Sequence, residues 1–373
     1  MEFANLGYSE EQIELLDVAV NFCREKSPID KVRALMDSET GYDAAVWAEI
    51  AALGWTAIAI PEELGGVGLS MAEVVPVAEQ MGRRLMASPF AASTIAAQAL
   101  IAGGRDEQKA HWLPKIAEGM AASMALYEPH GDWDLSHVTA SAASDGDQLR
   151  LSGTKQFVQW AQAAQLIIAS VSLNGKPALV LLAQDDIPAG ALRSESIVDE
   201  TRRSCALTLD GIVVPVSQLL DSDKAAMTLA HIDMTAALLQ SAEMCGGAQS
   251  VIDYTVDYMK TRTQFGKVIG SYQALKHPIV NAYVEYEKAR SHLYSAAHSF
   301  ADQGEGEIAV RMAKAAADKT YSHAADRAVQ FHGGFGFTHD CDAGLHRRAS
   351  IFAASQHGDA AWHRAKLADL LLG

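Results

Sequence analysis

The feature that most constrains the fold of this chain is a pair of polar, glycine-bearing segments set within helix-rich sequence. The first segment, residues 262–277, reads RTQFGKVIGSYQALKH, and the second, residues 330–338, reads QFHGGFGFT. Arg262 carries a planar guanidinium that can meet two phosphate oxygens at once, and Phe265 offers a ring face on which an adenine can stack. Together these groups indicate a dinucleotide site in a helical protein, outside a Rossmann fold.

The amides and glycines of the same segments extend this interpretation. Gln273 and Gln330 each offer paired hydrogen-bond donors and acceptors. Gly333 and Gly334 have no Cβ, so backbone N–H groups there can approach a pyrophosphate closely. A simpler alternative is that Arg262 caps a helix and the glycines only close a tight turn.

The two segments resemble the two C-terminal signature segments of the acyl-CoA dehydrogenase family. Residues 54–70, GWTAIAIPEELGGVGLS, resemble the N-terminal signature of that family, and residues 125–134, ALYEPHGDWD, stand where its flavin-loop motif is expected. Each motif alone is weak evidence. Because the four motifs occur in the family order along 373 residues, the chain is identified as a member.

The resemblance implies an α+β, mainly α fold with three parts. We expect an N-terminal helical domain over residues 1–120, a middle antiparallel β domain over 121–220, and a C-terminal four-helix bundle over 221–373. The residues agree: Asp145-Gly146 and Asn174-Gly175 are hairpin signals between alternating or apolar runs, and Ser9 begins a capping box ahead of a helical pattern.

The resemblance also implies an activity. Family members remove a proton from the α carbon and a hydride from the β carbon of an acyl-CoA thioester, and FAD accepts the hydride. One subunit holds the flavin ring, and its neighbour grips the ADP half of the cofactor. The ADP-gripping pattern is complete in this chain at seven positions: Arg262, Gln264, Phe265, Gln273, Gln330, Gly333 and Gly334.

The half-site for the flavin ring departs from the family pattern. Tyr127 replaces the threonine of the flavin loop, and Trp133 replaces its serine. The Trp-Ile-Thr/Ser segment that normally lies against the flavin reads Phe157-Val158-Gln159. Exchanging a hydroxyl for an indole in a packed site is not neutral. We therefore expect Trp133 to fill volume that a flavin or substrate would otherwise occupy.

The catalytic base of the family is also missing. His357 stands where the usual glutamate belongs, and Ala236 occupies the other position known for that glutamate. His357 is a weak candidate base, since a structural imidazole is the simpler interpretation. Glu243, seven residues beyond Ala236 on a similar helix face, suggests a pocket residue or a buried ion-pair partner.

Composition limits the partners. The chain has 30 Lys and Arg residues and 46 Asp and Glu residues, so its formal net charge of −16 argues against nucleic acid and anionic membranes. Four scattered cysteines, no signal peptide and no long apolar run predict a cytoplasmic protein without a membrane span. A His/Asp patch at His339, Asp340, Asp342 and His346 lacks convincing metal-ligand spacing, so no metal is expected.

The retained ADP half and the altered ring half together resemble the subunit that lacks the catalytic glutamate in heteromeric acyl-CoA dehydrogenases. Such enzymes act on bulky thioesters, such as steroid side-chain or dicarboxylyl-CoA substrates. We expect an α2β2 assembly with one FAD shared by each αβ pair, and electron-transfer flavoprotein as acceptor by family resemblance. Two alternatives stay open: an active homotetramer with a non-standard base, and a flavin-free structural partner subunit.

Overall fold

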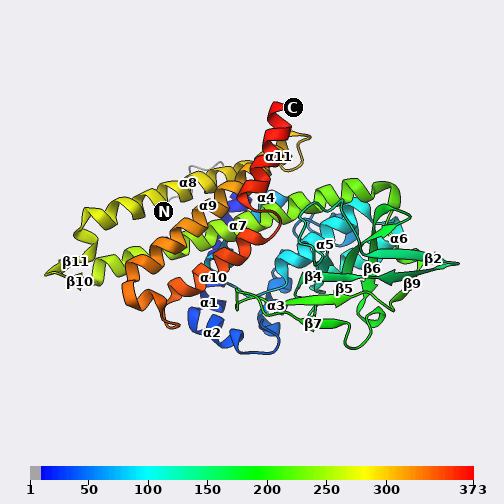
Figure 1. Ribbon diagram of the computed structural model, residues 1–373, viewed down its shortest axis with the longest axis horizontal. Helices are drawn as coiled ribbons and strands as arrows, with labels where there is room; N and C mark the ends of the chain where they lie inside the picture. The colour runs from blue at the N-terminus through cyan, green and yellow to red at the C-terminus, as the bar shows by residue number, and fades with distance from the viewer. Residues whose placement is uncertain (1–9) are drawn as a thin grey trace.

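The computed structural model describes residues 10–373, and Figure 1 shows an elongated molecule with a helical bundle at one end and β strands at the other. Ser9, the first residue of the predicted capping box, lies outside the described residues. The first part of the chain is helical, as predicted. Its α helices are α1 Glu10–Lys26, α2 Ile29–Met36, α3 Ala44–Ala52, α4 Met71–Arg83, α5 Phe90–Gly103 and α6 Asp106–Ala117.

The middle of the chain forms two sheets rather than one. A six-stranded sheet has the order β1-β5-β2-β3-β9, with β6 paired to β5, and a three-stranded sheet has the order β4-β8-β7. The strands are β1 Ala122–Ala125, β2 Ser141–Asp145, β3 Gln148–Ser152, β4 Thr154–Gln159, β5 Leu166–Leu173, β6 Lys176–Ala183, β7 Leu192–Ser194, β8 Ser204–Thr208 and β9 Val213–Pro215.

Both predicted hairpins are confirmed, and most strand pairs of the predicted antiparallel β domain are antiparallel, but two are parallel. The pairs β2–β3 and β5–β6 are antiparallel hairpins across Asp145-Gly146 and Asn174-Gly175. Strand β5, however, pairs in parallel with both β1 and β2, so the sheet is mixed. Turn residues report only the pairing of consecutive strands, whereas these parallel pairs join strands that are distant in sequence.

The last part of the chain is again helical, which confirms the mainly α fold class. Its helices are α7 Ala225–Thr261, α8 Gln273–Ser299, α9 Glu305–His332, α10 Asp342–Ser355 and α11 Ala360–Leu372, with a short two-stranded ladder, β10 Thr263–Gln264 and β11 Lys267–Val268, between α7 and α8. In Figure 1, α7, α8 and α9 run side by side along the bundle, and α11 projects away from the body.

Helices α4 and α7 approach each other through two glycines. A Cβ added to Gly246 would lie 1.8 Å from the carbonyl oxygen of Glu79, and one added to Gly82 would lie 2.1 Å from that of Glu243. No side chain fits at either position unless the helices separate. This close contact fixes the N-terminal helices against the bundle and places Glu243 beside the candidate site.

We expect Gly246→Ala to destabilise the chain by at least about 1–3 kcal/mol, since overpacking forces backbone shifts. Gly344→Ala is the control, because its Cβ would meet only the carbonyl oxygen of Thr338, at 3.8 Å. Denaturant unfolding of both variants measures the difference. Equal stability of the two variants would contradict this description of the α4–α7 contact.

Within the described residues, no helix is both long enough and apolar enough to cross a bilayer. All four cysteines are buried free thiols: Cys23, Cys205, Cys245 and Cys341.

Candidate functional site

The end of the bundle that carries β10 and β11 contains a large open pocket of about 970 Å³. It lies between the end of α7, the start of α8 and the end of α9. The pocket brings together six of the seven residues predicted to grip ADP; its lining includes Arg262, Gln264, Phe265, Gln330, Gly333 and Gly334, along with Tyr258, Ile269, Tyr272, His332 and Phe335. Gln273, the first residue of α8, is exposed but does not line this pocket.

Phe265 is held in an unusual conformation at the tip of the β10–β11 ladder. It has φ 54° and is followed by Gly266 with φ 74°, so both central residues of the turn are left-handed. A bulky residue rarely adopts this conformation. Its ring is 92% exposed. A strained backbone that presents a ring to open space suits a ring that stacks on a ligand or a neighbouring subunit.

The glycine pair leaves its backbone open to the pocket. Gly333 ends α9 with φ 61°, and a Cβ added to either Gly333 or Gly334 would meet no atom within 4 Å. A ligand can therefore approach the main chain there without moving any side chain. On the facing side, the guanidinium of Arg262 forms no hydrogen bond or ion pair with other described residues. These groups together provide a phosphate-sized opening with an unpaired cation beside it.

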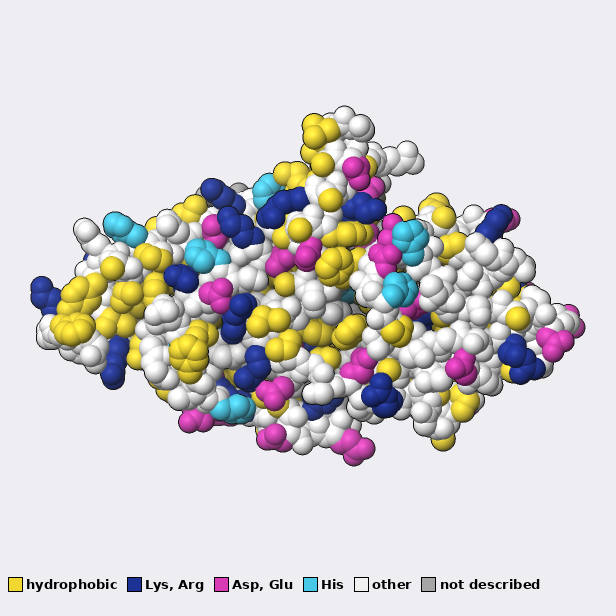
Figure 2. Space-filling model, in the orientation of Figure 1, with side chains coloured by type: hydrophobic (Ala, Val, Ile, Leu, Met, Phe, Trp, Pro, Cys, Tyr) yellow, Lys and Arg dark blue, Asp and Glu magenta, His cyan; other side chains and the backbone are white. Residues whose placement is uncertain are grey.

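An apolar surface surrounds this pocket. Figure 2 shows hydrophobic side chains gathered at the end of the bundle where β10 and β11 lie. Besides Phe265, Phe337 is 84% exposed, and Phe335 and Val268 are exposed by 42% and 41%. Contiguous exposed apolar side chains around a ligand pocket are typical of an interface with another protein.

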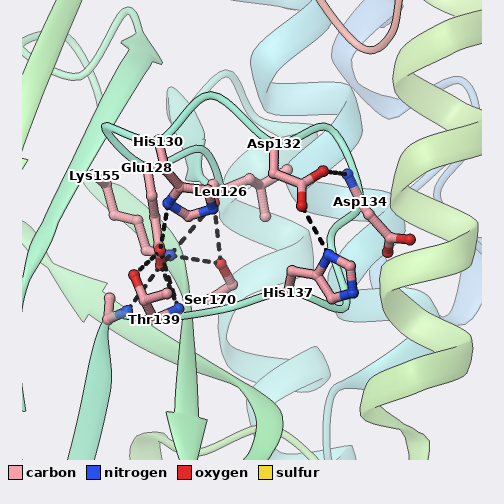
Figure 3. A network of polar contacts seen from close by, with 10 residues as sticks. Leu126, Glu128, His130, Asp132, Asp134, His137, Thr139, Lys155 and Ser170 are labelled. Atoms are coloured by element: carbon pink, nitrogen blue, oxygen red, sulfur yellow. Dashed lines mark hydrogen bonds and ion pairs between the residues drawn. The ribbon is translucent and has the colours of Figure 1, made fainter. Parts of the chain in front are cut away.

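Residues 125–134, which stand at the position of the flavin-loop motif, are anchored by a buried ion pair (Figure 3). Lys155 donates to Glu128 at 2.7 Å, and neither side chain is more than 3% exposed. Lys155 also donates to the Oγ of Ser170 at 2.9 Å. Glu128 accepts from the backbone N–H of Ala140 at 2.9 Å and from the hydroxyl of Thr139. Every group in the network therefore has a partner.

The electrostatics of this loop follow from its contacts. Burial alone would raise the pKa of Glu128, but Lys155, Thr139 and Ala140 hold it down at about 2. The carboxylate therefore stays ionised at neutral pH. Its role is to fix the loop that carries Tyr127 rather than to exchange protons.

Tyr127 and His357 close the pocket where a flavin ring and thioester would lie. The Tyr127 hydroxyl shares a hydrogen bond with Nδ1 of His357 at 2.7 Å. The remaining cavity, lined also by Phe157, Gln159 and Ala236, measures about 40 Å³. At ~10–15 Å³ per water, this volume holds about three waters.

Trp133 ties the loop to the end of α10, because its indole N–H donates to the carbonyl oxygen of Ser355 at 3.0 Å. Trp133 does not line the small cavity, so the expectation that it fills flavin or substrate volume stays a prediction. Phe157 has φ 55°, is 39% exposed and lines that cavity.

The imidazole of His357 is a weak base in this environment. Burial, with further contributions from Lys314 and His363, lowers the pKa of His357 to about 3. Its Nδ1 is already engaged in the hydrogen bond with Tyr127. A general base works best with a pKa near the operating pH, so this group is poorly suited to remove the α proton of a thioester.

This depressed pKa predicts an acid sensitivity. The folded-state pKa lies below the unfolded value of about 6.5, so the unfolded chain binds the proton more tightly and stability is lost as pH falls from about 6.5 towards 3. Between pH 7 and pH 4, the free energy of unfolding should fall by at least about 1 kcal/mol less in His357→Gln than in the unsubstituted chain. Urea unfolding at several pH values measures it, with the exposed His277→Gln as control. Parallel pH profiles would show that His357 is not buried as a neutral imidazole.

The other two candidate positions carry no available base. Ala236 is buried and lines the small cavity, but offers no acid. Glu243 lines the same cavity, and its carboxylate pairs with Arg202 at 2.9 Å and accepts from Gln240 at 3.3 Å. Burial alone would lower the pKa of Arg202, but Glu243 and Asp199 raise it. The geometry thus makes Glu243 both a pocket residue and an ion-pair partner, the two interpretations that its position suggested.

The His/Asp patch after the glycine motif is engaged in ordinary contacts. Asp342 pairs with Arg33 at 2.7 Å, and the carbonyl oxygen of His339 accepts from the same guanidinium. His346 shares a hydrogen bond with Tyr321 at 2.9 Å. Across residues 10–373, no group of three or more His, Cys, Asp or Glu side chains is placed to hold a metal ion.

Sequence reasoning missed three groups that shape the site. The Lys155–Glu128 pair, the Arg202 partner of Glu243, and Lys314 all lie in ordinary-looking sequence. Lys314 is fully buried and donates to the carbonyl oxygen of Gly358 at 2.8 Å, beside His357. Only the apolar neighbours of Lys314 in its helix could have signalled that this cation is buried.

Comparison with known proteins identifies the family. Residues 9–120 match the N-terminal domain of acyl-CoA dehydrogenases, and residues 233–372 match the C-terminal domain. Over 339 residues the chain is 30% identical to Acyl-CoA dehydrogenase IpdE2 of Mycolicibacterium smegmatis, with 91% of each chain covered. The chain belongs to the acyl-CoA dehydrogenase family.

Solved structures of acyl-CoA dehydrogenases share its fold. A variant of the Tcur3481-Tcur3483 steroid ACAD has a TM-score of 0.87 at 28% identity, covering 97% of this chain and 98% of that one. The ChsE4-ChsE5 complex from Mycobacterium tuberculosis has a TM-score of 0.90 at 24% identity, with 99% of both chains covered.

The cofactor of the acyl-CoA dehydrogenase family is FAD. The open pocket beside Arg262 has the volume, the unpaired cation and the exposed backbone that suit an ADP moiety. The cavity between Tyr127 and His357 is far smaller.

Proposed function

We propose that this chain is a subunit of a heteromeric, FAD-dependent acyl-CoA dehydrogenase. In that assembly, it contributes the ADP-binding half of a FAD site whose flavin ring is held by a partner subunit. The partner supplies the catalytic glutamate. The single observation that carries the proposal is the contrast between an open pocket of about 970 Å³ at Arg262 and a cavity of about 40 Å³ at His357.

The residues proposed to hold the ADP half are the seven that match the family pattern. Arg262 would pair with the pyrophosphate, Phe265 would stack on the adenine, and the backbone at Gly333 and Gly334 would approach the phosphates. Gln264, Gln273 and Gln330 offer amides for the ribose and base edges. Because Gln273 does not line the pocket, its contact would come from the rim.

The residues of this chain do not supply a suitable base for the reaction. FAD, where it is bound, supplies the hydride acceptor, and the protein must supply a base beside the α carbon. His357 has its pKa lowered to about 3, and its Nδ1 is occupied by Tyr127. Glu243 is neutralised by Arg202. An active homotetramer with either residue as base is therefore the weaker hypothesis.

The relatives suggest the substrate class. One matching structure is a steroid ACAD, and another is a complex of two chains, ChsE4 and ChsE5. We propose by analogy a bulky acyl-CoA thioester, such as one with a steroid side chain, and an α2β2 assembly. Electron-transfer flavoprotein is the expected electron acceptor.

The proposal is tested by assaying acyl-CoA-dependent reduction of a redox dye. The chain alone, its glutamate-bearing partner alone, and the two co-expressed are compared at equal protein concentration. We expect turnover only from the co-expressed pair. Turnover by the isolated chain, abolished by His357→Ala or Glu243→Ala, would support the homotetramer instead.

A further inference from the structure

A second large hollow, separate from both half-sites, lies where α1, α4, α7 and α10 meet. Its volume is about 660 Å³, within the range of small-molecule sites. Helix α4 packs against both α1 and α7, and α10 packs against α7. The hollow is strongly charged; its lining includes Arg24, Arg83, Arg84, Lys260, Asp253, Asp257 and Asp342, together with Ser27, Ile29, Leu85, Tyr254, Val256 and His346.

Each carboxylate in the hollow already has a cation. Asp253 pairs with Arg83 at 3.0 Å, and Asp257 pairs with Lys260 at 3.4 Å. The third carboxylate, Asp342, pairs at 2.7 Å with Arg33, which lies outside the lining. The three carboxylates that line the hollow are thus already paired with cations.

Two guanidiniums remain without a carboxylate among the described residues. Arg24 donates only to the side-chain oxygen of Asn21, at 2.7 Å. The side chain of Arg84, at the end of α4, has no hydrogen bond or ion pair to any described residue. Partial burial lowers the pKa of Arg84, and the like charges of Arg83 and Arg24 lower it further, with Cys23 and Asp253 acting in the opposite direction. An anion placed between these groups would relieve that repulsion.

We infer that this hollow binds a pyrophosphate-bearing ligand of nucleotide size. Two guanidinium forks from different helices, Arg24 on α1 and Arg84 after α4, suit two linked phosphoryl groups. Ile29, Val256 and Tyr254 give an apolar wall for the rest of such a ligand. The whole chain carries a formal charge of −16. Two cations without a carboxylate partner in one hollow therefore make a locally positive site on a negatively charged protein.

The site is distinct from the ADP pocket but shares a wall with it. His332 is stacked between Tyr254, at 4.7 Å between ring centroids, and Tyr258, at 4.2 Å. Tyr254 lines the charged hollow, whereas His332 and Tyr258 line the pocket at Arg262. A pyrophosphate could bind at either place, so any test must separate them.

The test is calorimetric titration of the full chain with inorganic pyrophosphate at low ionic strength. We expect a binding event that weakens at least tenfold in Arg84→Gln and in Arg24→Gln, and that persists in Arg262→Ala, which removes only the proposed pyrophosphate contact of the ADP pocket. Arg150→Gln, which removes the same charge from the exposed strand β3, is the control and should bind as the unsubstituted chain does. Circular dichroism and melting midpoints verify that every variant is folded.

Two results would overturn the inference. The first is no binding at millimolar pyrophosphate; if Arg84→Gln then also fails to assemble with its partner subunit, the hollow is a docking site for an acidic protein segment. The second is binding that is lost in Arg262→Ala but kept in Arg84→Gln, because the anion would then occupy the ADP pocket.

Discussion

Lys155→Met is expected to destabilise the chain by about 3–5 kcal/mol, because it leaves the buried carboxylate of Glu128 without its cation. Both side chains are at most 3% exposed, so water cannot replace the lost partner. The loop that carries Tyr127 and Trp133 would lose its anchor. Denaturant unfolding followed by circular dichroism measures the loss.

Two further variants make this expectation specific. Lys176→Met removes an exposed lysine from the start of β6, and its effect should stay within about 0.5 kcal/mol. The double variant Lys155→Met with Glu128→Gln should be less destabilised than the sum of the two single variants, since the pair is coupled. Additive effects, or a stable Lys155→Met variant, would contradict the structure of the network in Figure 3.

Arg262→Ala, introduced into the co-expressed assembly, is expected to weaken FAD binding about 30-fold or more. Losing a charge-assisted contact at an interface typically costs at least about 2 kcal/mol, which corresponds to that factor. Arg262 has no other partner among the described residues, so its removal should not disturb the fold. Flavin fluorescence during dilution of the assembly measures the change in affinity.

The matched control for Arg262 lies close by. Lys267 on β11 carries the same charge and is exposed, but it does not line the pocket. Lys267→Ala should leave the FAD affinity within about twofold. If both variants lose flavin equally, the effect comes from net charge at this end of the bundle. If neither does, the ADP half is held elsewhere and the proposed role of Arg262 is wrong.

The sequence predicted the parts of the fold that depend on local pattern. Helical periodicity and the turns at Asp145-Gly146 and Asn174-Gly175 identified the helices and two hairpins. The parallel pairing of β5 with β1 and β2 depends on contacts between distant segments, which no local pattern reports. Likewise, helical spacing alone does not tell which apolar side chains of α8 are buried: Ile279 and Tyr286 are buried, whereas Val280 is 55% exposed.

The candidate sites divide in the same way. Six of the residues proposed to bind ADP come from two short segments. The structure places them in one pocket because the end of α7, the start of α8 and the end of α9 lie together. The closure of the half-site for the flavin ring depends on contacts between distant segments. Tyr127 and His357 are 230 residues apart, and only the fold shows that they share a hydrogen bond. The partner of Glu243, Arg202, comes from the segment before β8 and was equally hidden.

Flavin stoichiometry tests the central claim most directly. The isolated chain and its assembly with the glutamate-bearing partner are purified, their masses are determined under native conditions, and FAD is quantified by visible absorbance. The account predicts little or no FAD on the isolated chain and one FAD for each pair of unlike chains. One FAD per copy of the isolated chain, with the flavin reduced by an acyl-CoA, would contradict it.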